Sequence, residues 1–179
     1  MNPKKIAIIG GPGAGKSTLI DALKSEGFLC YDEISRQIII QAQQDGVDQL
    51  FLTDPLLFSQ KLLEGRTKQF LDASQEPKSH VFIDRGIPDV LAYMDYIGDN
   101  YPQYFIDACN TYKYDTVFVL APWEAIFVSD NERYENFEQA VKIHKHLLET
   151  YKRFGYTLAE VPFGSIKNRV QFIVEALSL

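Results

Sequence analysis

Short apolar runs alternate with longer amphipathic stretches along this chain. Five of the runs hold four or five residues each, mostly β-branched, aromatic or aliphatic, which is typical of strands buried on both faces of a sheet. These runs are Lys5–Ile9, Phe28–Tyr31, His80–Ile83, Thr116–Leu120 and Thr157–Val161. Because helical stretches separate them, the pattern predicts a three-layer α/β fold, with a five-stranded parallel sheet flanked by helices.

Several of the intervening stretches carry helix start signals. Asp54 is followed by Pro55. Aspartate is a preferred N-cap residue, and proline is well tolerated at the first helical position because its missing N–H would be unpaired there. Pro88 begins a stretch in the same way, and Asn136 with Gln139 three residues later has the pattern of a capping box. We expect helices over Lys16–Ser25, Ser35–Gln44, a long stretch from Asp54, Pro88–Ile97, a stretch from Asn136, and Ser165–Leu177.

Length and composition indicate a single globular domain and exclude several other classes of protein. The 179 residues suit one compact domain, which we expect to span residues 1–179. Hydrophobic residues make up 46% and charged residues 23%, which is ordinary for a globular protein and excludes disordered and fibrous chains. With 18 basic and 24 acidic residues the net charge is −6, so we expect no nucleic-acid partner, which would require a basic surface.

The cysteines and the lengths of the apolar runs indicate in which cellular compartment the protein is expected. Cys30 and Cys109 are the two cysteines and form no C-x-x-C motif, so neither a disulfide framework nor a zinc site is predicted. The apolar run within Met1–Gly10 is too short for a signal-peptide core. No apolar run approaches the roughly 20 residues that span a bilayer. We therefore expect a cytoplasmic protein without a membrane partner.

The strongest chemical signal lies between the first predicted strand and the first predicted helix. Residues 10–17 read Gly-Gly-Pro-Gly-Ala-Gly-Lys-Ser and match G-x-x-x-x-G-K-[ST] in full. Glycines let the backbone turn its N–H groups toward an anion, and the following helix adds its positive end. The alternative is a glycine-rich turn with a surface lysine. The expected nucleotide-binding residues are Gly11, Pro12, Gly13, Ala14, Gly15, Lys16, Ser17 and Thr18.

Such a loop binds a nucleoside triphosphate, and the type of residue assigns two roles within it. Lys16 would reach the β- and γ-phosphates, and the Ser17 hydroxyl would bind a magnesium ion that bridges them. After the fourth strand the chain reads Leu-Ala-Pro-Trp rather than the N-K-x-D that reads guanine, which favours ATP over GTP. The third strand ends Phe-Ile-Asp-Arg, without the D-E pair of oligomeric ATPases. A small-molecule kinase fits these patterns best.

Carboxylates follow two of the predicted strands. Ligands of open α/β sheets lie beyond the carboxyl ends of the strands, so Asp32, Glu33 and Asp84 should converge on the loop. Asp84 is the candidate magnesium ligand, because hard cations prefer oxygen, and the alternative is a turn or capping aspartate. Glu33 is the better candidate for the base that takes a proton from an attacking hydroxyl. Asp32 is its competitor, and a solvated acidic turn is the alternative.

Arginines are candidates for stabilising negative charge during transfer. Arg85 directly follows Asp84, and its planar fork of donors suits a phosphate; Arg36 offers the same group from the second helix. Arg133 lies in a polar segment at about residues 122–136 that we expect to form a lid, and a lid arginine can neutralise a transferred phosphoryl group. Structural ion pairs are the alternative for Arg85 and Arg36, and a solvated charge for Arg133.

Two further groups are candidate ligand contacts. The turn at residues 162–164, Pro-Phe-Gly, follows the last strand and either lies beside the nucleotide base or is a plain connection. Asp89, Tyr93 and Tyr96 share one face of the helix that begins at Pro88. They either line an acceptor pocket or belong to the core.

Taken together, these residues resemble the small P-loop ATPase domains of the nicotinamide-riboside-kinase and translocation-defect type, which are often filed as AAA-type domains. The resemblance covers nearly the whole chain, at residues 10–18, 32–36, 82–89, 121–135 and 161–169. It implies a fold similar to nucleoside and nucleotide kinases, with strand order 2-3-1-4-5. It also implies that ATP and magnesium bind at Lys16, Ser17 and Asp84, and it fixes no substrate.

We therefore predict a magnesium-dependent ATP phosphotransferase that acts on a small hydroxyl- or phosphate-bearing metabolite, such as a nucleoside or nucleotide. Its predicted catalytic residues are Lys16, Glu33, Asp84, Arg85 and Arg133. The alternative belongs to another class: a nucleotide-binding switch or slow NTPase that signals to a protein partner. In that class Glu33 needs no catalytic role.

Overall fold

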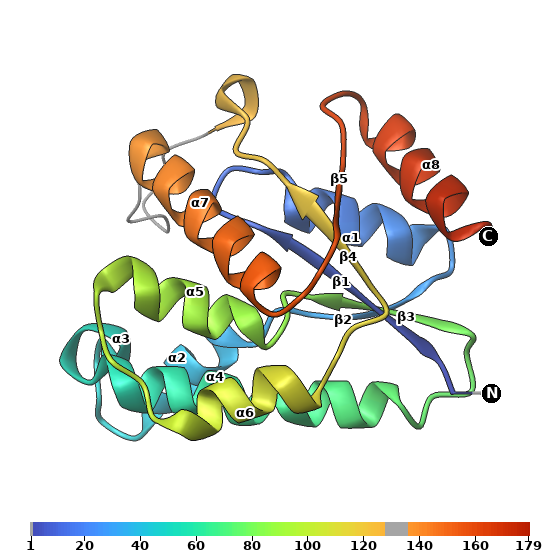
Figure 1. Cartoon of the computed structure of the whole chain (residues 1–179). Coiled ribbons are helices and arrows are strands. Elements are labelled where there is room, and N and C mark those ends of the chain that lie inside the picture. Colours follow the sequence, from blue (N-terminus) through green and yellow to red (C-terminus); the bar gives the residue numbers. More distant parts are fainter. Residues whose placement is uncertain (1, 128–135) are drawn as a thin grey trace.

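Five parallel strands form one sheet in the order β2-β3-β1-β4-β5, which confirms the predicted order. The structure is a computed structural model, and it describes residues 2–127 and 136–179 (Figure 1). The strands are β1 (Lys4–Gly10), β2 (Leu29–Tyr31), β3 (His80–Asp84), β4 (Thr116–Leu120) and β5 (Leu158–Glu160). The two edge strands pair on one side only, and each is shorter than its apolar run predicts.

Helices cover both faces of this sheet. One face carries α1 (Lys16–Ser25) and α8 (Ile166–Leu177), as Figure 1 shows. The opposite face carries α4 (Pro55–Ala73), α5 (Pro88–Ile97), α6 (Gln103–Thr111) and α7 (Phe137–Arg153). The remaining elements are α2 (Ser35–Gln44), α3 (Leu50–Thr53) and the 3₁₀-helix η1 (Glu124–Ile126). This arrangement is the predicted three-layer α/β fold.

Side chains of the central strand alternate between two apolar cores. In β1, Ile6 and Ile8 pack with the core under α1 and α8, whereas Ala7 and Ile9 pack with the core under α4 to α7. All four are fully buried. Burial of an aliphatic side chain stabilises the fold by about 1.5–3 kcal/mol, so the continuous apolar runs are what holds the sheet between its two helical layers.

The predicted helix starts are confirmed by their capping contacts. The Asp54 carboxylate accepts a hydrogen bond of 2.9 Å from the Leu57 N–H at the start of α4. At the start of α7, Asn136 accepts from the Gln139 N–H at 2.9 Å, and the Gln139 side chain accepts from the Asn136 N–H at 2.8 Å. These contacts satisfy backbone donors that the helix itself leaves unpaired.

Three short elements differ from the expectation: α3, α6 and η1 are not predicted by the sequence pattern. None of their N-caps makes a side-chain hydrogen bond, so the usual start signal is missing. In α6 the helix is held instead by Phe105 and Cys109, which are buried in the core. None of the described helices combines the length and the hydrophobicity needed to cross a membrane.

The strand register brings the candidate residues to one edge of the sheet. Ile8 of β1 pairs with Asp84 of β3, and the Arg85 N–H continues this pairing with a 3.0 Å hydrogen bond to the Ile8 carbonyl. Tyr31, which ends β2, pairs with Ile83. The phosphate-loop motif, Asp32-Glu33 and Asp84-Arg85 therefore all follow the carboxyl ends of adjacent strands.

Candidate active site

A cavity of about 610 Å³ lies at this edge of the sheet. One wall is the loop itself, since all eight predicted nucleotide-binding residues, 11–18, line it. Gly15 has φ of 75°, a left-handed conformation that favours glycine, and directly after it Lys16 begins α1. The N-terminus of α1 is thereby exposed to the cavity, which is the geometry of an anion site.

Lys16 and Asp84 form a buried ion pair at the base of the loop. Their side chains are 8% and 7% exposed. Burial, and after it the positive charge of Arg85, lowers the pKa of Lys16, and Asp84 opposes this shift. The structure therefore brings together two of the predicted catalytic residues, with Lys16 lining the cavity.

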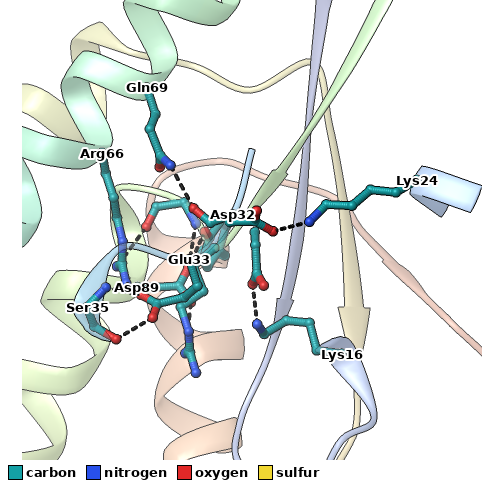
Figure 2. Close-up of polar contacts among 12 residues, drawn as sticks. Lys16, Lys24, Asp32, Glu33, Ser35, Arg66, Gln69 and Asp89 are labelled. Atoms are coloured by element: carbon teal, nitrogen blue, oxygen red, sulfur yellow. Dashed lines mark hydrogen bonds and ion pairs between the residues drawn. The ribbon is translucent and has the colours of Figure 1, made fainter. Parts of the chain in front are cut away.

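Glu33 faces the cavity and is held by contacts on two sides (Figure 2). Ser35 donates from its backbone N–H at 3.0 Å and from its hydroxyl, and Arg66 donates from Nη2 at 3.3 Å. Although burial alone would raise the pKa of Glu33, the charges of Arg66 and Arg85 and the bonds from Ser35 lower it to about 2. Glu33 is therefore an ionised, oriented carboxylate at neutral pH.

Asp32, the competitor of Glu33, points in another direction. Its carboxylate pairs with Lys24 of α1 at 2.5 Å and is 63% exposed, while its backbone carbonyl accepts from the Gln69 side chain at 2.7 Å. Figure 2 shows this side chain turned toward Lys24, away from Ser35 and Arg66. Of the two carboxylates, Glu33 is the one that lines the cavity.

Arg66 is a site residue that the motifs did not reveal. It lies in α4, is 4% exposed, and donates to the Gly86 carbonyl at 3.2 Å as well as to Glu33. The signal in the sequence is its position: Leu62, Arg66 and Phe70 are spaced by four residues along the buried face of α4. A buried guanidinium is stable only when it is hydrogen-bonded, and here its partners are the Gly86 carbonyl and the Glu33 carboxylate of the site.

Arg85 lines the cavity from an unusual backbone conformation. Its φ is 71°, in the left-handed region that residues other than glycine rarely adopt. Asp89 holds the turn that follows: its carboxylate accepts from the Gly86 N–H at 3.0 Å and from the Tyr151 hydroxyl at 2.5 Å, and lies 3.6 Å from Arg85 Nη1. Arg36, in contrast, is exposed on α2.

The wall opposite the phosphate loop is mostly apolar and aromatic. Tyr93 and Tyr96 of α5 both line the cavity, with ring centroids 6.3 Å apart, as the pocket interpretation of this helix face expects. Asp89 also reaches the cavity, although it is nearly buried. The apolar and aromatic side chains of this wall include Phe51, Phe58, Leu62, Val90, Tyr93 and Tyr96.

The segment after β4 approaches the phosphate loop from the other side. The Phe127 ring lies directly against Gly13. Trp123 stacks on Phe163, with ring centroids 5.1 Å apart and an interplanar angle of 28°, so the predicted Pro-Phe-Gly turn is in contact with the start of the predicted lid. Arg133 and the rest of residues 128–135 lie outside the described residues.

The oxygen donors beside the loop fit a phosphate-bound magnesium ion. No group of three or more His, Cys, Asp or Glu side chains in the described part of the chain could hold a metal by itself. Magnesium in phosphate-transfer sites usually takes one or two protein oxygens together with substrate phosphates and water. Ser17 lines the cavity, and Asp84 contacts Lys16 beside it, so a hydroxyl and a carboxylate are present at the base of the loop.

Comparison with known proteins agrees with this geometry. An AAA domain family model matches residues 5–169. Deoxyadenosine kinase from M. mycoides, solved with bound dATP, is 20% identical and superposes with a TM-score of 0.69 over 98% of this chain and 100% of its own. Thymidylate kinase from Candida albicans is 18% identical, with a TM-score of 0.68 over 99% and 92%.

A third solved structure is similar over part of its length. The NadR protein in complex with NAD and AMP-PNP is 14% identical and has a TM-score of 0.70, over 99% of this chain but 50% of the other. No curated protein sequence matches the chain. At these identities the solved structures establish the P-loop kinase fold alone.

Proposed function

The chain belongs to the AAA domain family, and we propose that it is a magnesium-dependent kinase that phosphorylates a hydroxyl group of a small, nucleoside-like metabolite with ATP. One observation carries this proposal. A single cavity joins the phosphate loop at residues 11–18 to the ionised carboxylate of Glu33. A triphosphate and an acceptor hydroxyl would therefore meet within it.

The residues of the loop would bind the donor. Backbone N–H groups of residues 11–18 and the Lys16 ammonium would hold the β- and γ-phosphates. Ser17 and Asp84 would hold magnesium, which neutralises phosphate charge and orients the γ-phosphoryl group. Arg85 would stabilise the charge on the equatorial oxygens, because this residue lines the same cavity as the phosphate loop. For Arg133 a similar role from the lid remains a prediction.

Glu33 would act on the acceptor. Its carboxylate accepts the hydrogen bond of the attacking hydroxyl and so aims the oxygen at the γ-phosphorus. As the new oxygen–phosphorus bond forms, the bond between the γ-phosphorus and the β,γ-bridging oxygen breaks, ADP leaves, and the hydroxyl proton passes to Glu33. A pKa of about 2 keeps this group ionised at neutral pH, so both carboxylate oxygens can accept hydrogen bonds, including the one from the attacking hydroxyl.

The apolar wall supports a nucleoside-like acceptor. Tyr93, Tyr96 and Phe58 present aromatic surface on which a flat base stacks favourably. The name of one structurally similar protein, deoxyadenosine kinase, points to a nucleoside acceptor, and that of another, thymidylate kinase, points to a related acceptor that already carries a phosphate.

The test compares phosphate transfer with hydrolysis. The protein is incubated with MgATP and each member of a panel of purine and pyrimidine nucleosides, with and without the 2′-hydroxyl, and ADP formation is followed. We expect at least one nucleoside to raise the rate well above that without acceptor, and a nucleoside monophosphate to appear by mass spectrometry. ADP formation that no nucleoside changes would contradict the kinase proposal and favour a nucleotide-dependent switch.

A further inference from the structure

We propose that Arg169 is a positioning residue that presets the phosphate loop for its anion and connects this loop to Trp123. The inference rests on the proposed function, because its ligand is the nucleoside triphosphate of the same site. It adds a residue from the C-terminal helix α8, far in sequence from the loop.

Arg169 is almost completely buried behind the loop. It is 1% exposed, and its Nη2 donates to the Ala14 carbonyl at 3.2 Å. Among the residues that the structure describes, Nε has no hydrogen-bond partner, and no carboxylate forms an ion pair with the guanidinium. A buried charge with no counter-charge among the described residues is costly, so its position beside an anion-binding loop points to a role there.

The contact with Ala14 fixes the orientation of a backbone donor. Because a trans peptide unit is planar, its C=O and the next N–H point in opposite directions. When Arg169 holds the Ala14 carbonyl on the outer side of the loop, the Gly15 N–H is turned the other way, toward the side on which residues 11–18 line the cavity. The donor is thus oriented before any phosphate binds.

Arg169 packs so closely against Gly15 that this position leaves no room for a side chain. A Cβ built at Gly15 would lie 2.9 Å from Arg169 Nη1, so any side chain there would displace the guanidinium. The close approach and the positive φ of Gly15 together explain why this position of the loop suits glycine.

Trp123 lies against the same guanidinium. The Arg169 guanidinium carbon lies 5.9 Å from the centroid of the Trp123 ring, which itself stacks on Phe163. A cation over an indole face is favourable and sensitive to geometry. Because the sequence contains one tryptophan, its fluorescence reports on this contact without interference from others.

The experiment measures MgATP, MgGTP and pyrophosphate binding by calorimetry, together with tryptophan emission, in the parent and in Arg169→Met. We expect the variant to bind all three at least about 10-fold more weakly, as expected for loss of a charged hydrogen bond at the loop. The change in emission that MgATP causes in the parent should be lost. Lys167→Met, an exposed charge on the same helix, is the matched control and should behave as the parent.

Each outcome decides the inference. Arg169→Met with parent-like affinities, or a parent that binds MgATP without any change in emission, overturns it. If Arg169→Met does not fold by circular dichroism, Arg169→Lys decides: weaker binding of all three ligands supports the inference, and unchanged binding overturns it. A parent that binds MgATP but phosphorylates no acceptor contradicts only the proposed function. A parent that binds none of the ligands overturns both.

Discussion

Replacement of Arg66 tests the network that holds Glu33. Arg66→Met keeps most of the apolar volume in α4 but removes the ion pair with Glu33 and the hydrogen bond to the Gly86 carbonyl. Loss of one partner of a buried ion pair costs about 3–5 kcal/mol. Since the Glu33 side chain is 21% exposed and keeps the bonds from Ser35, we expect the lower end, about 3 kcal/mol at pH 7.

The pH dependence gives this prediction a second observable. The pKa of Glu33 is lowered from 4.5 to about 2 in the fold, so Glu33 stabilises the protein above pH 4.5, and this contribution is lost as the pH falls toward 2. The size of the contribution at neutral pH is about 3 kcal/mol. Without Arg66 the pKa of Glu33 rises, so the contribution shrinks. The difference between parent and variant should therefore narrow by about 1 kcal/mol between pH 7 and pH 3.5.

Urea unfolding at the two pH values measures both effects. Lys68→Met is the matched control, because Lys68 lies on the same helix and pairs with Asp72 in the solvent, where such pairs contribute about 1 kcal/mol at most. An Arg66→Met protein within 1 kcal/mol of the parent at pH 7 would refute the reasoning. So would a difference that stays constant down to pH 3.5.

Three further substitutions test separate parts of the account. Glu33→Gln should leave the MgATP dissociation constant unchanged and lower the rate of phosphate transfer, measured by steady-state kinetics, by about 10²–10⁴-fold. An unaltered transfer rate would remove Glu33 from the mechanism. Tyr151→Phe removes one buried hydrogen bond to Asp89 and should lower the free energy of unfolding, measured with urea, by about 1–3 kcal/mol. Tyr104→Phe is the control, because Tyr104 is exposed and its replacement should change this free energy little. Equal effects of the two substitutions would contradict the buried network. Asn136→Ala should cost about 0.5–2 kcal/mol in the same assay by removing the cap of α7, and no loss would show that the cap contributes nothing.

The fold follows closely from local signals where these are complete. The start of α1 after the phosphate loop, the start of α5 at Pro88 and the capping box of α7 lie where the sequence predicts them. Helix α6 was missed because its stability comes from Phe105 and Cys109 in the core, a tertiary contact that leaves no mark in the local pattern. The predicted edge strands extend past the observed ones at Phe28, Thr157 and Val161. At Phe28 the reason is a competing contact, because its N–H donates to the Leu23 carbonyl at the end of α1 rather than to a neighbouring strand.

The site was predictable where chemistry is local and less so where it depends on packing. The loop motif and the carboxylates after two strands identify Lys16, Glu33 and Asp84, and topology brings these residues to one sheet edge. Arg66 and Arg169 come from the middle of one helix and the first turns of another. Their roles depend on how these helices pack, and the sequence offers only the weak signal of a charged residue on a buried face.

Calorimetric titration of MgATP into the parent and into Lys16→Ala tests the central claim most directly. The loop should bind one MgATP in the parent, and the substitution should weaken binding by roughly 10- to 150-fold or more, as the loss of a charge-assisted hydrogen bond predicts. Lys24→Ala, which removes the more exposed pair with Asp32, should bind as the parent does. Equal affinity in the parent and in a folded Lys16→Ala protein, or no binding to the parent, would contradict the account.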